Sequence, residues 1–107
     1  MELVYNKIGE INKVCKKYHI SLLYVFGSIL TNKYNDDSDI DFVVYFEEVP
    51  LLEYADNFFD FLNELELIFD KKIDLVSGKA MKNPYFIKEV ERTKKLVYGH
   101  RNKEIIV

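Results

Sequence analysis

One run of eight residues sets the architecture of this chain: Asp39-Ile-Asp-Phe-Val-Val-Tyr-Phe46. Side chains alternate between the two faces of a β-strand, so one face of this run is wholly apolar and the other begins with two carboxylates. The apolar face comprises Ile40, Phe42, Val44 and Phe46. The other face comprises Asp39, Asp41, Val43 and Tyr45. The run therefore predicts a strand with one buried face and a charged beginning.

The residues before this strand predict another strand and a turn. Residues 22–26 form an apolar run that is too short for a buried helix and is stopped by Gly27-Ser28, which indicates a buried strand. We expect Ser28 to open a short helical turn and residues 32–38, rich in Asn and Asp, to form a loop. Further upstream, apolar residues at three- and four-residue steps predict one amphipathic helix. They are Val4, Ile8, Ile11, Cys15 and Tyr18.

The residues after the strand predict a long helix and further short elements. Pro50 starts a helix that continues to about residue 69, and residues 73–76 form a strand in which Asp74 faces away from its apolar neighbours. Residues 77–83 are a loop, and Pro84 suits the first turn of a helix ending near residue 94. A short strand is compatible with residues 96–98, and residues 100–107 receive no prediction.

The order α-β-α-β-α-β-α describes one small α/β (α+β) domain with a mixed β-sheet flanked by helices. At 107 residues the chain has enough length for one hydrophobic core, and we expect residues 1–107 to form a single domain. Hydrophobic residues make up 49% of the sequence, which excludes a disordered chain.

The net charge of −3 conceals a strong asymmetry. Residues 34–70 contain twelve acidic residues and no Lys or Arg, whereas residues 78–107 carry eight basic residues and three acidic ones. A general nucleic-acid binder would present a basic face over much of the domain, so direct nucleic-acid binding is not expected. The acidic centre instead indicates a need for cations.

The remaining composition points to an intracellular chain. Cys15 is the single cysteine and lies at an apolar helical position, so we expect it in the core rather than in a disulfide. His19 and His100 lack partners at zinc-ligand spacing and are expected at the surface. No apolar run approaches the roughly 18 residues of a membrane span, and we expect a cytoplasmic protein without a membrane contact.

Three carboxylates are candidates for a metal site. Asp39 and Asp41 lie ~6 to 7 Å apart on one face of the predicted strand, and Asp74 lies on a neighbouring predicted strand. Taken singly, each suits a solvated strand end or turn. Together they repel one another unless a cation neutralises them. A hard ion such as Mg²⁺ prefers oxygen ligands and leaves room for phosphate oxygens.

Gly27-Ser28 adds a candidate phosphate site ten residues before Asp39. Glycine lets the backbone approach a ligand closely, and Ser28 offers a hydroxyl and an N–H to phosphate oxygens. An ordinary strand-to-helix turn is the alternative explanation of the same pair.

The combination of Gly27-Ser28, Asp39-Ile40-Asp41 and Asp74 resembles the active-site pattern of the nucleotidyltransferase superfamily related to DNA polymerase beta, specifically its minimal nucleotidyltransferase (MNT) branch. The likeness covers nearly the whole chain. It implies a nucleotidyltransferase fold, ATP as substrate, two Mg²⁺ ions, and transfer of a nucleoside monophosphate to an acceptor hydroxyl with release of pyrophosphate.

The resemblance also implies roles for individual residues. Asp39 and Asp41 would bind both metal ions, and Asp74 would bind the ion that activates the acceptor. Gly27 and Ser28 would hold the β and γ phosphates. Many relatives carry an arginine shortly after the Gly-Ser turn, where this chain has Ile-Leu-Thr-Asn at residues 29–32. An arginine contact to the triphosphate therefore cannot be carried over, and Lys33 is either its substitute or a solvated loop residue.

Short members of the MNT branch often act as the antitoxin of a HEPN/MNT toxin–antitoxin pair. The resemblance implies that such a protein transfers AMP from ATP to a tyrosine of a HEPN ribonuclease, encoded next to it, and so silences the toxin in a hetero-oligomer. The chain is short, so we expect its acceptor to come from the partner. Two alternatives stay open: a non-catalytic antitoxin that acts by binding, and an adenylyltransferase for small molecules of the aminoglycoside type.

Two further features have two explanations each. The long helix carries more aromatic residues than a narrow stripe needs, which indicates a wide core-facing stripe or a protein-contact face. These residues are Tyr54, Phe58, Phe59, Phe61 and Phe69. The basic C-terminal third is a solvated helix face, or else it meets nucleotide phosphates or the partner.

Overall fold

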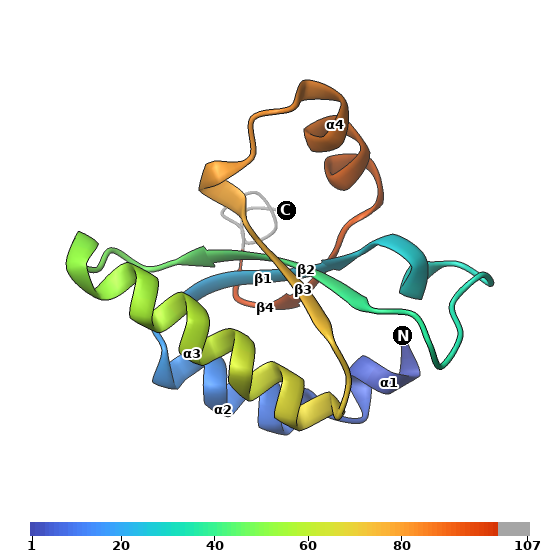
Figure 1. Ribbon diagram of the computed structural model, residues 1–107, viewed down its shortest axis with the longest axis horizontal. Coiled ribbons are helices and arrows are strands. Elements are labelled where there is room, and N and C mark those ends of the chain that lie inside the picture. Colours follow the sequence, from blue (N-terminus) through green and yellow to red (C-terminus); the bar gives the residue numbers. More distant parts are fainter. Residues whose placement is uncertain (101–107) are drawn as a thin grey trace.

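The computed structural model describes residues 1–100, and its elements are drawn in Figure 1. The helices are α1 (Glu2–Tyr5), α2 (Ile8–Lys17), α3 (Leu51–Phe69) and α4 (Pro84–Thr93). The strands are β1 (Ile20–Phe26), β2 (Ile40–Phe46), β3 (Ile73–Ser77) and β4 (Lys95–Tyr98). Two short 3-10 turns, η1 (Gly27–Leu30) and η2 (Gly78–Ala80), follow β1 and β3.

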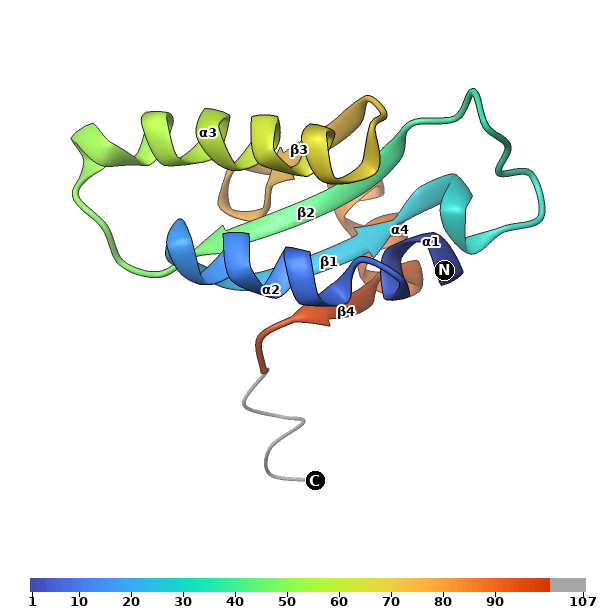
Figure 2. The same ribbon diagram turned by 90° about the horizontal axis from the view of Figure 1, so that it is seen from below.

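The four strands form one mixed sheet in the order β3-β2-β1-β4. Strand β1 is antiparallel to both β2 and β4, whereas β2 and β3 are parallel. A parallel pair needs a crossover between its strands, and α3 provides it. Helices α2 and α3 cover one face of the sheet and α4 lies on the other (Figures 1 and 2). The predicted mixed sheet with flanking helices is confirmed.

The main core lies between the sheet and helices α2 and α3. The predicted apolar face of β2 is buried there, and Ile40, Phe42 and Val44 are fully inaccessible to solvent. Helix α3 contributes Phe61 and Leu65 to the same cluster. Tyr54 and Phe58 pack against this cluster, whereas Phe59 remains 59% exposed. The aromatic residues of the long helix are therefore mostly a wide core-facing stripe.

Cys15 also lies in this core, as predicted. Burial raises the pKa of its thiol to about 12, because the charged thiolate is poorly solvated there. His19 and His100 are both exposed, as expected.

A smaller cluster fills the opposite face, under α4. It consists of Tyr24, Phe26, Val43 and Val90. The Lys94 ammonium lies 4.2 Å from the centroid of the Tyr24 ring and 2.8 Å from a Glu91 carboxylate oxygen. This cation–π contact fastens the end of α4 to β1. The face of β2 that begins with carboxylates is thus apolar further along, where Val43 packs under the helix.

The structure corrects three details of the sequence prediction. The single helix expected over the first eighteen residues is divided into α1 and α2: Asn6 is the C-cap of the first helix and Lys7 the N-cap of the second. Strand β2 begins at Ile40, one residue after Asp39. Strand β1 begins at Ile20, two residues before the predicted start, whereas the short strand considered for residues 96–98 is confirmed as β4, which pairs with β1. No secondary structure is predicted for residues 100–107, and all of these except His100 lie outside the described residues.

Within residues 1–100, no helix is both long and apolar enough to cross a lipid bilayer.

Candidate active site

The three candidate aspartates gather at the beginning of the two parallel strands. Asp39 immediately precedes β2, Asp41 is its second residue, and Asp74 is the second residue of β3. The parallel register makes Asp41 and Asp74 direct Cα partners. Asp39 and Asp74 are exposed, and Asp41 is half-buried. The structure therefore brings together the carboxylates of Asp41 and Asp74, which are 33 positions apart in the sequence, and Asp39 lies close by.

The surroundings of Asp41 raise the pKa of its carboxyl group to about 6. Burial is the largest cause, because the ionised form loses solvation. The negative charge of Asp74, a hydrogen bond between the two carboxyl groups, and the charge of Asp39 act in the same direction. The ionised form of Asp41 is thus electrostatically unfavourable when no cation is present.

Gly27 lies directly against this pair. It follows β1, whose last residue, Phe26, is the register partner of Asp41. Its φ of +81° belongs to the left-handed region that favours glycine. A Cβ at this position would also overlap the Asp41 carboxylate, 3.1 Å from its Cγ. Two features therefore require glycine at position 27: the positive φ of the turn, and the space that the Asp41 side chain occupies.

The predicted short helical turn is present, but it begins at Gly27, and Ser28 is its second residue. The Ser28 carbonyl oxygen accepts a hydrogen bond of 2.9 Å from the Thr31 N–H and one of 2.8 Å from the Thr31 hydroxyl. Thr31 in turn accepts a hydrogen bond from the Lys33 N–H. These bonds fix the conformation of the turn, and Lys33 itself is exposed in the loop that follows.

The donor set suits a hard divalent cation only in part. Over residues 1–100, no group of three or more His, Cys, Asp or Glu side chains is arranged to hold a metal ion. Asp41 and Asp74 form a close pair, and Asp39 is near enough for its charge to raise the pKa of Asp41. Mg²⁺ commonly binds through one or two carboxylates together with water and substrate phosphates. The carboxylate pair therefore fits such an ion when a nucleotide supplies further oxygens.

A pocket of about 520 Å³ adjoins Gly27 on the α4 side. Its walls include Phe26, Gly27, Phe86 and Arg92. Helix α4 is positioned by Asn83, whose side-chain oxygen accepts hydrogen bonds from the Tyr85 and Phe86 N–H groups, and by Pro84 in its first turn. Sequence patterns predicted the helix but not its place beside the glycine turn. The only sequence feature that pointed to this position of α4 was the basic character of the C-terminal third.

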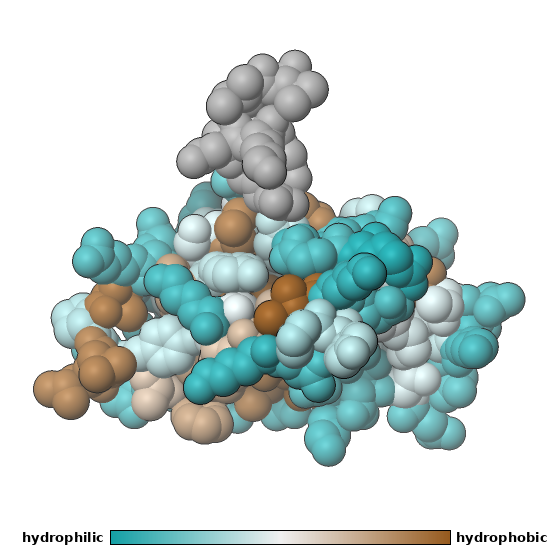
Figure 3. All heavy atoms as spheres, turned by 90° about the horizontal axis from the view of Figure 1, so that it is seen from above, coloured by the Kyte–Doolittle hydropathy of each residue, from teal (hydrophilic) through white to brown (hydrophobic). Residues whose placement is uncertain are grey.

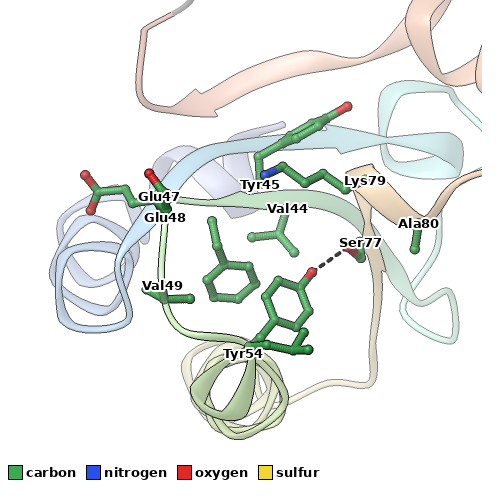
Figure 4. A pocket seen from close by; sticks show the side chains of 11 residues that line it. Val44, Tyr45, Glu47, Glu48, Val49, Tyr54, Ser77, Lys79 and Ala80 are labelled. Atoms are coloured by element: carbon green, nitrogen blue, oxygen red, sulfur yellow. Dashed lines mark hydrogen bonds between the residues drawn. The ribbon is translucent and has the colours of Figure 1, made fainter.

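A different pocket, of about 370 Å³, lies further along β2 and β3 (Figure 4). Val44 and Ser77 line it, and this pair is three register positions, ~10 Å, from Asp41 and Asp74. The Tyr54 hydroxyl is 2.5 Å from the Ser77 Oγ across its floor. Hydrophobic side chains gather at this end of the molecule, where Leu51 and Leu52 are 86% and 92% exposed (Figure 3). This pocket is separate from the carboxylates.

The strand order, with paired carboxylates at the head of two parallel strands and a glycine turn against them, is that of a nucleotidyltransferase domain. The chain belongs to the DNA polymerase beta nucleotidyltransferase family, because the family model described as "Polymerase beta, Nucleotidyltransferase" matches residues 9–103. The family assignment made from Gly27-Ser28 and the aspartates is confirmed.

Individual proteins support this membership. A relative in Methanocaldococcus jannaschii, provisionally named a protein adenylyltransferase, is 38% identical over 76 residues, which cover 71% of this chain and 74% of the relative. A crystal structure of a toxin–antitoxin with AMP-PNP has a chain that is 20% identical with a TM-score of 0.69, covering 92% of this chain and 78% of that one.

A third similar chain comes from a complex of a tri-AMPylated HEPN toxin of Shewanella oneidensis with its MNT antitoxin. It is 18% identical with a TM-score of 0.65, and the match covers 96% of this chain and 78% of that one. At these identities the two solved structures establish the shared fold.

Proposed function

We propose that this chain transfers AMP from ATP to a tyrosine hydroxyl of a partner HEPN-type ribonuclease toxin and thereby acts as its antitoxin. The family supplies the reaction class, and the similar chains from toxin–antitoxin complexes support the choice of partner. The observation that carries the proposal is the Asp41–Asp74 pair against Gly27, since it places anionic metal ligands beside a backbone that a phosphate can approach.

In this proposal the five site residues divide metal binding, proton acceptance and phosphate binding among them. Asp39 and Asp41 would hold two Mg²⁺ ions, and Asp74 would hold one of them and accept the proton of the acceptor hydroxyl. Gly27 and Ser28 bind the β and γ phosphates. When bound, two such ions neutralise the triphosphate and stabilise the entering and leaving oxygens of an in-line displacement. The acceptor oxygen forms a bond to the α-phosphorus while the bond to pyrophosphate breaks.

The electrostatics of the pair agree with these roles. The pKa of Asp41 is raised by burial and by the charges of Asp74 and Asp39, and a bound divalent cation would offset both the lost solvation and the repulsion between the carboxylates. Because Asp41 contacts Gly27, a phosphate bound along the glycine backbone would lie next to the same carboxylate.

Labelled ATP tests the proposal. The chain is incubated with Mg²⁺, ATP labelled in its α-phosphate, and the HEPN-type protein encoded beside it. We expect label to appear on the partner with the wild type and not with the double variant D39N/D41N. Asp60→Asn, a change at an exposed position on α3, is the matched control and should transfer label normally.

Three outcomes contradict the proposal in whole or in part. Absence of transfer by the wild type would exclude protein adenylylation, and normal transfer by D39N/D41N would exclude these residues as metal ligands. If the double variant transferred nothing yet still neutralised the toxin in cells, antitoxin action by binding alone would replace catalysis as the protective mechanism.

A further inference from the structure

Helix α4 and the glycine turn enclose the pocket of about 520 Å³ described above. This volume lies in the range of small-molecule binding sites. Its walls are mostly apolar, and the rings of Phe26 and Phe86 meet edge to face at a centroid distance of 5.8 Å. Gly27 forms part of the wall, so a ligand in this pocket lies next to the glycine that contacts the Asp41 carboxylate. Gly27 thus links the two: it lines the pocket and contacts Asp41, whereas none of the three aspartates lines the pocket itself.

A triphosphate at this place needs positive charge from the protein. Residues 29–32, directly after the glycine turn, contain no basic residue, and none occurs from residue 34 to residue 70. The three aspartates add further negative charge. The basic side chains that line the pocket are Arg92 and Lys95. Both come from the C-terminal third, where the sequence is rich in Lys and Arg.

The Arg92 guanidinium is hydrogen-bonded to Glu89, a partner whose place a phosphate can take. Its Nη2 donates a hydrogen bond of 2.6 Å to Glu89 Oε1, and its Nε donates one of 3.3 Å to Glu89 Oε2. Glu89 lines the same pocket. Both side chains are well exposed, and such surface pairs contribute little stability. The planar guanidinium matches a phosphate as well as it matches a carboxylate, and its Nη1 donors point to no partner among the bonds described.

We propose that this pocket binds the nucleoside triphosphate and that Arg92 supplies the cationic contact to its phosphates. The inference rests on the proposed function and adds to it a nucleotide-binding residue from α4. Phe26 and Phe86 form the apolar wall of the site, and Glu89 orients the guanidinium in the absence of nucleotide. When ATP binds, Arg92 exchanges its carboxylate partner for a phosphate. Figure 3 shows this side of the molecule, with hydrophilic side chains over part of the face and hydrophobic ones gathered at one end.

Equilibrium binding of Mg·ATP to the purified chain tests the inference with four variants: R92Q, R92K, E89Q and K88Q. Lys88 is exposed on the same helix and does not line the pocket, so K88Q is the matched control. Loss of a charge-assisted phosphate contact should weaken ATP binding at least about tenfold in R92Q. R92K keeps the positive charge but loses the planar, bidentate donors of the guanidinium, so its affinity for ATP should lie between those of R92Q and the wild type.

E89Q separates a binding role from a structural one. If Arg92 serves the nucleotide, E89Q removes a competing negative charge and binds ATP as tightly as the wild type or more tightly. If the ion pair only stabilises α4, E89Q and R92Q weaken binding equally, and the inference is overturned. Equal affinity of R92Q and K88Q also overturns it while leaving the proposed function intact. Absence of ATP binding by the wild type would instead refute the proposed function, and the inference with it.

Discussion

Asp41 and Asp74 are cross-strand neighbours: their Cα atoms are partners in the parallel β2–β3 register, and Asp74 raises the pKa of Asp41, for which burial is the largest cause. Two acids at such a position repel each other when both are ionised. The fold tolerates the repulsion between the two carboxylates because buried residues further along β2 and β3, including Phe42, hold the two strands in the core. A destabilising pair that the sequence retains is a frequent property of functional sites.

Replacing Asp41 by Asn should stabilise the chain at pH 7 in the absence of divalent cations. The unfolded chain releases the Asp41 proton near pH 3.8 and the folded chain near pH 6, so the folded state binds more protons between these values. The stability of the wild type therefore falls as the pH rises across this window and stays lower above it. The gain in D41N is about 1 kcal/mol, after allowance for solvent screening of a half-buried group.

Thermal unfolding in a chelating buffer measures this effect at pH 4 and pH 7. The difference between D41N and the wild type should be larger at pH 7 and nearly absent at pH 4. A variant less stable than the wild type at pH 7 would show that the Asp41 carboxylate makes a favourable interaction in the folded chain, contrary to the electrostatics described.

Two glycine substitutions should have opposite effects. Gly27→Ala places a methyl group against the Asp41 carboxylate at a positive φ, so we expect a loss of at least about 1 kcal/mol in the free energy of unfolding. Gly9 lies in α2 with no atom within 4 Å of an added Cβ. Gly9→Ala should therefore stabilise the chain by up to about 1 kcal/mol.

Chemical denaturation of both variants provides the comparison, and Mg·ATP binding provides a second readout. G27A should lose nucleotide binding and G9A should retain it. Equal stability of G27A and the wild type would mean that the turn and the carboxylate rearrange freely, and that Gly27 is not fixed against Asp41.

Phe61 and Phe59 are neighbours on α3 that differ in burial. Phe61 is fully buried between the helix and the sheet, whereas Phe59 is 59% exposed. Phe61→Ala should lower the free energy of unfolding by about 3 to 5 kcal/mol, and Phe59→Ala by less than about 1 kcal/mol. Urea unfolding curves measure both values. Similar losses in the two variants would contradict the placement of α3 on the sheet.

Much of the fold could be predicted because local patterns coincide with tertiary burial. The alternation from Ile40 to Phe46 predicted which side of β2 is buried, and Pro84 predicted where α4 begins. The gathering of Asp39, Asp41 and Asp74 was also expected. It follows from carboxylates at the beginning of adjacent strands, combined with a family resemblance.

Other features depend on pairings between distant residues. The break between α1 and α2 leaves the apolar spacing of the first segment unchanged, so periodicity does not reveal it. The position of Arg92 beside Gly27 depends on β4 pairing with β1, since this pairing draws the preceding helix across the sheet. A solvated basic helix and a phosphate-binding helix have the same local sequence pattern, and only their location separates them.

The rate of AMP transfer by Asp74→Asn tests the central claim most directly, because Asp74 joins the site only through the β2–β3 register. Intact mass of the HEPN-type partner, followed over time with Mg·ATP, gives the rate, and Asp60→Asn provides the control. Loss of a metal ligand costs several kcal/mol of transition-state stabilisation, so D74N should be slower by at least about a hundredfold. A D74N rate equal to that of D60N would contradict the assignment of the Asp41–Asp74 pair as the catalytic centre.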